Sequence, residues 1–325
     1  MSEPATVLVT GAAGMIGQKL IRRLALDGQV GGRIIGRLVA HDIIALSDLP
    51  SADFPIVVKT GDFAAVRTAA DLVAERADII FHLAGVVSGE AEADFDKGYR
   101  VNLDGTRQLF DAIRQASPGY HPRLVFASSM AVFGGPFPDI VPDDFHVTPL
   151  SSYGTQKMIG EALLADYTRK GFLNGVGIRL PTICVRPGKP NRAASGFFSS
   201  IIREPLDGKP ATIPVSRKTV HTHASPRAAV DFLVHAAGLD GALIGPRRNL
   251  TMPGVAVSVN EQIEALERVA GGHVVQLIRD EPDEAVAAIV NTWPSRFSAS
   301  RARELGFRAE PDFDTIIRVH LDDRA

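Results

Sequence analysis

The chain has 325 residues, with 35 lysines and arginines against 37 aspartates and glutamates, so its formal net charge is −2. This balance argues against a nucleic-acid or membrane partner, because such proteins usually carry a basic field or a polybasic cluster. The composition, 45% hydrophobic and 22% charged, is that of an ordinary globular protein with one large domain or two. The single cysteine, Cys184, excludes an intrachain disulfide and favours a reducing compartment. We therefore expect an unprocessed cytoplasmic protein with neither a secretory signal nor a membrane span.

Short apolar runs alternate with helical patterns along roughly the first 180 residues. Residues 6–10 form a β-rich run that leads through glycines into a helical pattern over 16–26. Parallel strands cannot be joined by tight hairpins, so this alternation predicts strands connected by right-handed crossovers. The expected fold class is α/β, with a Rossmann-type doubly wound parallel sheet. Its further strands are expected at residues 37–42, 55–59, 78–83, 124–127 and 175–180.

The alternation loosens after about residue 182, where a turn-rich and mixed region begins. A strand edge followed by a helix over 221–237 is expected to return to the first domain. We therefore predict a first domain of residues 1–182 with about 219–240, and a smaller C-terminal α/β domain of residues 183–218 and 241–325.

Three glycines, Gly11, Gly14 and Gly17, follow the first predicted strand with the spacing Gly-x-x-Gly-x-x-Gly. Between a strand and a helix, such a turn lets the backbone, including Met15 and Ile16, approach a pyrophosphate at the helix N-terminus. The placement favours a dinucleotide-binding site. The spacing alone also fits glycines that only close a turn.

An acid, Asp42, ends the second predicted strand and follows Gly17 by about 25 residues, near the roughly 20 expected of an acid that binds the adenosine ribose. Its charge would repel a 2′-phosphate, so NAD is favoured over NADP. Arg33 and Arg37 keep NADP open as an alternative, and an aspartate after a strand is also a common turn residue. The long segment 28–36 leaves the alignment of Asp42 open.

Tyr153 and Lys157 stand four residues apart and would share one face of a helix. An ammonium about 4 Å away favours a phenolate by about 4 kcal/mol at an effective dielectric constant of about 20, and desolvation opposes this. Upstream, Ser129 follows a predicted strand at the edge where parallel sheets bind ligands, so it is placed to hydrogen-bond a reacting oxygen. An ordinary amphipathic helix and a serine in a turn are the structural alternatives.

The glycine turn, residues 82–85, residues 101–106, Ser129 and the Tyr153/Lys157 pair occur in the order typical of one enzyme family. In these motifs the chain resembles the extended short-chain dehydrogenases/reductases of the NAD-dependent epimerase/dehydratase type. The resemblance implies an NAD-binding Rossmann domain, a smaller substrate domain, Ser129, Tyr153 and Lys157 as the catalytic set, and a homodimer formed through the helices that carry Asn102 and Tyr153.

The resemblance also implies which residues surround the cofactor. Asp62 and Phe63 would flank the adenine, and Asn102 would support the active-site helix. Leu83, Ala84 and Gly85 would line the cofactor, and Pro181 and Ile183 would lie beside the nicotinamide.

Within this family, the run 179–206 most resembles dehydrogenases that act on D-erythronate. This implies NAD-dependent oxidation of the C2 hydroxyl of a four-carbon sugar acid to the 2-oxo acid. The substrate's carboxylate needs cations or amide donors, although each candidate also fits a solvated surface position. The predicted substrate residues are Ser88, Ser129, Tyr153, Asn191 and Arg217, with Lys189 and Arg192 as further cations.

Two other functions remain open. A nucleotide-sugar epimerase or dehydratase that retains NAD would use the same residues, and a noncatalytic NAD-binding protein is a third reading, which the catalytic set argues against. We predict no metal site, because His221 and His223 lack a third clustered ligand. Cys184 is expected in the core.

Overall fold

The structure is a computed structural model that describes residues 3–46, 48–116, 118–188 and 194–324. It divides into two compact units. The first comprises Met1–Ser129, Ser151–Arg179 and Val230–Leu250, and the second Met130–Leu150, Leu180–Ala229 and Thr251–Ala325.

The first unit is built on an eight-stranded sheet, in which the order is β11-β7-β6-β5-β1-β3 and both β2 and β4 lie beside β3. β1 pairs in parallel with β3 and β5, as do β3 with β4 and β5 with β6. This arrangement confirms the predicted α/β class and its mostly parallel sheet. The strands are β1 (Ala5–Thr10), β2 (Gln29–Val30), β3 (Arg33–Asp42), β4 (Ile56–Thr60), β5 (Ile79–His82), β6 (Arg123–Ser129), β7 (Asn174–Leu180) and β11 (Asn249–Thr251).

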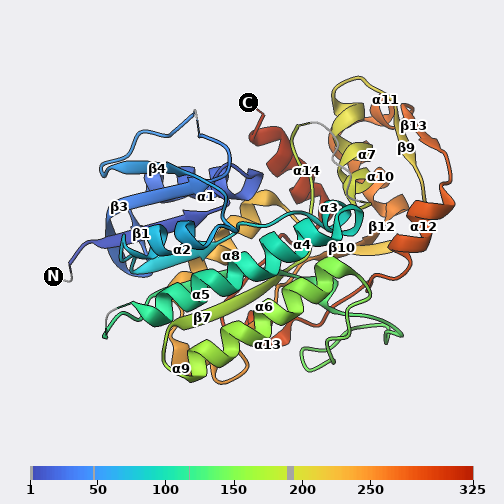
Figure 1. Cartoon of the computed structure of the whole chain (residues 1–325). Helices are drawn as coiled ribbons and strands as arrows, with labels where there is room; N and C mark the ends of the chain where they lie inside the picture. Colours follow the sequence, from blue (N-terminus) through green and yellow to red (C-terminus); the bar gives the residue numbers. More distant parts are fainter. Residues whose placement is uncertain (1–2, 47, 117, 189–193, 325) are drawn as a thin grey trace. The chain divides into compact units, whose positions relative to one another are not determined.

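Both faces of this sheet are covered, because successive residues of the central strand β1, whose side chains point to opposite faces, are buried. Leu8 packs in a core with side chains of α2, α5 and α6, whereas its neighbours Val7 and Val9 are also fully buried and point the other way. On the first of these faces α5 and α6 run side by side (Figure 1), where the Tyr167 hydroxyl donates to Asp111 at 2.8 Å. The helical segments are α1 (Met15–Asp27), α2 (Val66–Val73), α3 (Ser88–Ala93), α4 (Phe95–Gly98), the π-helix η1 (Tyr99–Gly105), α5 (Thr106–Gln115), α6 (Ser152–Arg169) and α9 (Gly241–Ile244).

The second predicted strand is longer than expected. It begins at Arg33 rather than residue 37, because Gly31 and Gly32 have φ values of 58° and 74° and turn the chain into a hairpin between β2 and β3. Consecutive positive φ values match the twist of a two-residue hairpin, and glycine adopts them without strain. Segment 28–36 is longer than a simple connection between α1 and the next strand because it contains this hairpin.

The second unit holds two small sheets, ordered β12-β10-β8 and β13-β9, and a core in which Phe198 of α7, Leu266 of α10 and Ile316 of α14 are buried together. Cys184 is buried in the same core, as predicted. The strands are β8 (Thr182–Ile183), β9 (Ala211–Ile213), β10 (Val220–Ala224), β12 (Val255–Ser258) and β13 (Ile278–Asp280). The helical segments are η2 (Met130–Val132), α7 (Gly196–Leu206), α10 (Val259–Ala270), α11 (Gly272–Val275), α12 (Glu284–Val290), α13 (Ser300–Glu304) and α14 (Phe313–Asp322), and α8 (Pro226–Gly238) passes from this unit into the first.

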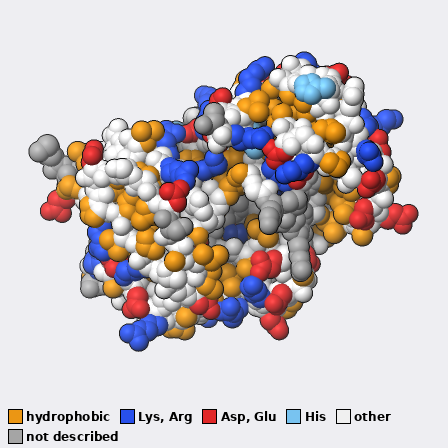
Figure 2. All heavy atoms as spheres, turned by 90° about the horizontal axis from the view of Figure 1, so that it is seen from above, with side chains coloured by type: hydrophobic (Ala, Val, Ile, Leu, Met, Phe, Trp, Pro, Cys, Tyr) orange, Lys and Arg blue, Asp and Glu red, His pale blue; other side chains and the backbone are white. Residues whose placement is uncertain are grey.

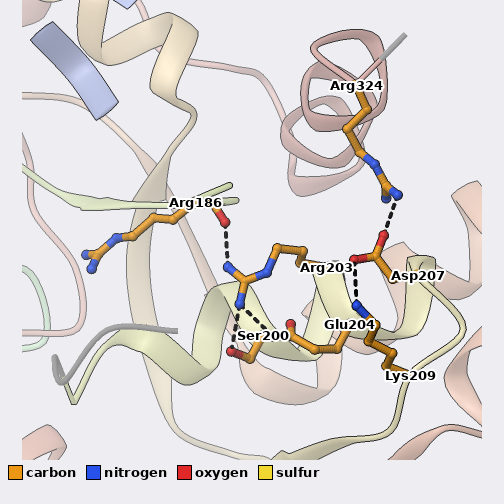
Figure 3. A network of polar contacts seen from close by, with 7 residues as sticks. All are labelled: Arg186, Ser200, Arg203, Glu204, Asp207, Lys209 and Arg324. Atoms are coloured by element: carbon orange, nitrogen blue, oxygen red, sulfur yellow. Dashed lines mark hydrogen bonds and ion pairs between the residues drawn. The ribbon is translucent and has the colours of Figure 1, made fainter. Parts of the chain in front are cut away.

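A polar network joins the end of α7 to the residues after α14 (Figure 3). The buried Arg203 donates to the carbonyl of Arg186 at 2.6 Å and pairs with Glu204 at 2.6 Å. One turn further, Asp207 accepts from Arg324. These bonds satisfy a buried guanidinium, which is costly to leave unpaired, and anchor the C-terminal helix.

Charges of both signs are interspersed with hydrophobic side chains on the face shown in Figure 2, as expected from the small net charge. In the described part of the chain, no helix has the length and apolar character needed to cross a membrane.

The hairpin turn provides a test of backbone strain. Gly32 has φ near 74° and open space around its Cα, so Gly32→Ala should cost about 1–2 kcal/mol of unfolding free energy through φ alone. Gly32→Asn should cost clearly less, because asparagine tolerates this region better. Urea unfolding of the three proteins measures this, and equal stability of the alanine and asparagine variants would contradict it.

Candidate functional site

The glycine turn is packed too tightly for side chains at two of its three positions. A Cβ on Gly11, whose φ is 71°, would lie 2.7 Å from the backbone of Leu83 and Ala84. A Cβ on Gly17 would lie 2.3 Å from the carbonyl oxygen of Gly11. Gly14 is the N-cap of α1 and carries no side chain, so the way to the amides of Met15 and Ile16 stays open. The turn therefore presents a helix N-terminus to an anion.

Asp42 lies directly over this turn. One oxygen of its carboxylate accepts from the amide of Ala13 at 2.9 Å, and the other from the amide of Ile44 at 3.2 Å. The sequence left the alignment of Asp42 open, and the structure shows that Asp42 ends β3 with its carboxylate beside the glycine turn.

The two arginines that kept NADP open are engaged elsewhere. Arg37 pairs with Glu75 at 2.6 Å and Arg33 with Asp78 at 2.8 Å. Arg37 also precedes Asp42 by five residues of strand, about 16 Å at the usual rise. The local charge at the end of β3 is therefore set by the carboxylate of Asp42, which favours a ribose diol over a 2′-phosphate.

Asp62 and Phe63 follow β4 but differ in exposure. The Asp62 carboxylate accepts from Arg100 at 2.5 Å and from the amide of Ala64 at 3.0 Å. The Phe63 ring is 5% exposed, with its centroid 4.9 Å from the ring of His82. The Phe63 side chain thus belongs to the core, whereas Asp62 stands at the surface.

The predicted catalytic residues all lie in the first unit. Ser129 is the last residue of β6, and α6 begins at Ser152, so that Tyr153 and Lys157 lie one turn apart near its start. The Lys157 ammonium lies 5.7 Å from the Tyr153 ring centroid and donates to the carbonyl of Ala127 at 2.9 Å. Ala127 precedes Ser129 by two residues, so strand β6 and helix α6 hold this set jointly.

The ammonium of Lys157 is almost completely buried, since the residue is 5% exposed. Burial lowers the pKa of Lys157 to about 8, and the charge of Glu161 partly offsets this. The side chain is therefore mostly a cation at neutral pH, but a poorly solvated one. Such a cation strongly favours an anion or a hydroxyl dipole beside it, which suits a lysine that promotes a tyrosine phenolate.

The two adjacent serines point in opposite directions because they lie on a strand. Ser128 is buried and donates to Glu161 at 2.6 Å, while Arg179 donates to both oxygens of Glu161, at 2.7 Å in the shortest contact. The Ser129 side chain therefore points to the other face of β6, away from Glu161. Sequence reasoning missed Glu161 and Arg179, although Glu161 follows Lys157 by one helical turn on the same face.

Asn102 joins two segments of the site. It lies in η1, where its Oδ1 accepts from the amide of Val86 at 2.8 Å, and its Nδ2 donates to the Val86 carbonyl at 3.2 Å and to Gln156 at 2.8 Å. Gly85 is adjacent, since a Cβ there would lie 2.8 Å from Asn102 Oδ1 and 3.7 Å from Lys157 Nζ. The loop after β5, which carries Leu83 to Gly85, is thereby held close to Lys157.

The predicted substrate residues are more dispersed. Ser88 is half-buried at the first turn of α3, shortly after the segment clamped by Asn102. Arg217, in the second unit, already makes a forked ion pair with Asp280, at 2.9 Å. Pro181 and Ile183 are buried in the second unit. Asn191, Lys189 and Arg192 lie outside the described residues.

The histidine pair of the second unit is engaged in neutral hydrogen bonds. His221 lies 2.7 Å from the Thr182 hydroxyl, and His223 lies 2.9 Å from the Gln262 amide. Burial lowers the pKa of His221 to about 4. Within the described ranges, no three His, Cys, Asp or Glu side chains are grouped so as to hold a metal ion.

Comparison with known proteins identifies the family. The model of the NAD dependent epimerase/dehydratase family matches residues 7–240. The chain belongs to this family. The membership confirms both the predicted family and NAD as the predicted cofactor, which the described residues fit: the glycine turn admits a pyrophosphate, and Asp42 lies over it.

The chain is similar to two curated relatives over almost its full length. It is 47% identical to the D-erythronate dehydrogenase of Cupriavidus necator over 323 residues, which cover 98% of each chain. It is 38% identical to the D-erythronate dehydrogenase of Haemophilus influenzae, over 97% of this chain and 98% of the relative. Among solved structures, one described as the nucleoside-diphosphate-sugar epimerase of Agrobacterium tumefaciens is 55% identical, with a TM-score of 0.96, covering 98% of this chain and 94% of that one.

The burial of Lys157 leads to a prediction about stability. Its lowered pKa corresponds to a cost on the order of 3 kcal/mol for keeping a buried ammonium below about pH 8. Lys157→Met should therefore raise the melting temperature at neutral pH while abolishing turnover.

The sign of the pH dependence follows from proton binding. Between about pH 8 and the ordinary lysine pKa of 10.5, the unfolded wild type holds a proton that the folded one has lost. Wild-type stability should rise through this window, and its difference from Lys157→Met should shrink. Melting curves from pH 7 to about 10 measure this; a difference that grows with pH would contradict it.

Proposed function

We propose that this protein is an NAD-dependent dehydrogenase that oxidises the C2 hydroxyl of a four-carbon sugar acid, D-erythronate, to 2-oxo-erythronate. The dehydrogenase class, acting on a CH–OH group, follows from the family and the two full-length dehydrogenase relatives. The main observation in support of this chemistry is the buried Lys157 ammonium beside the Tyr153 ring, near the end of β6, whose last residue is Ser129.

In the proposed reaction, NAD supplies the acceptor for the hydride that leaves C2. Tyr153, as phenolate, takes the proton of the C2 hydroxyl, and Ser129 holds that oxygen by a hydrogen bond. Lys157 stabilises the phenolate, because its ammonium is buried and has little water to compete with the anion. The C2–H and O–H bonds break as the C2 carbonyl forms, and one proton is released for each reduced cofactor.

We assign the first unit to the cofactor and the catalytic set, and the second unit to the substrate. Arg217, an exposed cation of the second unit, is the described candidate for binding the substrate carboxylate. We also propose a cytoplasmic homodimer, formed through the helices that carry Asn102 and Tyr153. The buried, unpaired Cys184 is compatible with a reducing compartment.

A second function is favoured by one observation, the 55% identical structure described as a nucleoside-diphosphate-sugar epimerase. An epimerase would use the same base and return the hydride to the sugar, so the reduced cofactor would not accumulate. The two dehydrogenase relatives favour net oxidation.

Substrate assays separate the two functions. With NAD and D-erythronate, absorbance from the reduced cofactor should rise steadily to many turnovers per protein. Other aldonates should react more slowly, and UDP- or dTDP-sugars should give no net reduction. Epimerisation of a nucleotide sugar, together with no reduction by any sugar acid, would exclude the proposed function.

The base is tested by Tyr153→Phe, which removes only a hydroxyl. We expect a loss of kcat of at least about 1000-fold, in the range typical of removing a general base or nucleophile, with the Kd for NAD within a few-fold of wild type. Tyr120→Phe is the matched control, because its hydroxyl donates to the Ala77 carbonyl at 2.9 Å within the core. Turnover of Tyr153→Phe at wild-type rate would rule out Tyr153 as the base.

A further inference from the structure

A buried histidine, His82, ends strand β5, directly before the loop of Leu83 to Gly85. It is fully buried, and its ring lies 4.9 Å from that of Phe63 and 5.6 Å from that of Phe126, measured between centroids. A buried imidazole needs a partner at each ring nitrogen, since an unsatisfied one costs about 1–3 kcal/mol. His82 has both partners: one comes from the end of β1 and the other from the start of α5.

The partners are two threonine hydroxyls. Thr10, the last residue of β1 and the neighbour of Gly11, has its Oγ1 2.9 Å from His82 Nδ1. Thr106, the first residue of α5 directly after η1, has its Oγ1 2.9 Å from His82 Nε2. His82 therefore bridges the strand that leads into the glycine turn and the helical segment that carries Asn102.

The direction of each hydrogen bond follows from the two groups at the ends of the series, the Asn102 carbonyl, which can only accept, and the Ala84 amide, which can only donate. The Thr106 hydroxyl donates to the Asn102 carbonyl at 2.7 Å, so its oxygen must accept from His82, and His82 carries its proton on Nε2. Nδ1 is then an acceptor, to which the Thr10 hydroxyl donates. The Thr10 oxygen in turn accepts from the amide of Ala84 at 3.3 Å. Only this tautomer gives every proton in the series an acceptor.

The series needs a neutral ring. Burial, reinforced by the charge of Lys157, lowers the pKa of His82 to about 3. A proton on Nδ1 would face the Thr10 oxygen and leave the Thr10 hydroxyl proton without its acceptor. The environment and the hydrogen-bond geometry thus require the same state.

Beyond Asn102 the contacts reach the active-site helix. The Asn102 amide holds the Val86 peptide by both its NH and its CO, and donates to Gln156 at 2.8 Å. Gln156 is fully buried and immediately precedes Lys157 on α6. Asn102 itself lies in a π-helical turn, a geometry that depends on local hydrogen bonding and is frequent at functional sites.

We propose that His82 is a positioning residue. Its neutral imidazole, protonated on Nε2, fixes the position of Asn102 relative to the glycine turn. Through Asn102 and Gln156 it also fixes the start of α6, which carries Lys157. It touches neither substrate nor cofactor in this role. The proposal rests on the proposed function only in treating Tyr153 and Lys157 as the catalytic pair.

Thr106→Val tests the series, because valine keeps the shape of threonine and removes the hydroxyl that joins His82 to Asn102. Misplacement of the catalytic set should lower kcat for D-erythronate about 10- to 100-fold, with the KM for NAD within about threefold. Thr106→Ser, which restores the hydroxyl, should recover kcat to within about threefold of wild type.

The control is again Tyr120→Phe, which also removes one buried hydroxyl from the first unit. It should lower the melting temperature about as much as Thr106→Val does but leave kcat within about twofold of wild type. If both variants lose stability alike and both keep kcat, His82 and its partners are merely structural, and the proposal is wrong.

The tautomer is tested on the wild-type protein without substrate. In ¹⁵N-histidine-labelled protein, the ring signals absent from His82→Gln should show a protonated Nε2 and an unprotonated Nδ1, unchanged from about pH 5 to 8. A proton on Nδ1, or titration in this range, would overturn the proposal. Because no turnover is needed, this result stands even where D-erythronate proves not to be the substrate and the proposed function fails.

Discussion

The ammonium of Lys157, buried between β6 and α6, is the interaction on which the site depends. A cation taken out of water needs fixed dipoles or anions around it. The chain provides the Ala127 carbonyl at 2.9 Å, the face of Phe126 with its centroid 5.0 Å away, and the carboxylate of Glu161 one turn along the helix. This partial compensation leaves the lysine a cation at neutral pH that gains from any further negative charge. A phenolate at Tyr153 is the group that the geometry favours.

The neighbours of Lys157 follow from the same requirement. Glu161 is itself nearly fully buried, so it needs Arg179 and Ser128 as partners, and these tie α6 to β7 and β6. That fixation holds the end of β6, and with it Ser129, against the helix that carries Tyr153, the proposed base. The burial of one ammonium thus explains why Glu161 lies one turn along the helix, and why Arg179 and Ser128, which take no part in the proposed reaction, bond to Glu161.

The sequence could predict those parts of the site that depend on local pattern. Alternating strands and helices, the glycine turn and the Tyr153/Lys157 spacing are each encoded within a few residues. It could not fix the position of Asp42, because the preceding glycines had to be recognised as a hairpin turn before the strand could be aligned. Nor could it show that Arg217 meets Asp280, or that Gln156 meets Asn102, since these pairs join residues 63 and 54 positions apart. Such partners are set by packing, which periodicity does not report.

Dehydrogenases and epimerases of this family share hydride chemistry, so the residues of the first unit serve either function equally. The difference must come from groups that bind the rest of the substrate and so decide whether the product departs before the hydride returns. For a small acid, the decisive group is a cation for its carboxylate. Arg217 is the predicted cation that the structure describes, and its guanidinium is already matched to the carboxylate of Asp280 in forked geometry. To bind Arg217, the substrate carboxylate would have to replace the Asp280 carboxylate, which has the same charge and makes the same two hydrogen bonds. Because the pair is exposed, with Arg217 41% accessible, it is worth only about 0–1 kcal/mol, and such an exchange is energetically small.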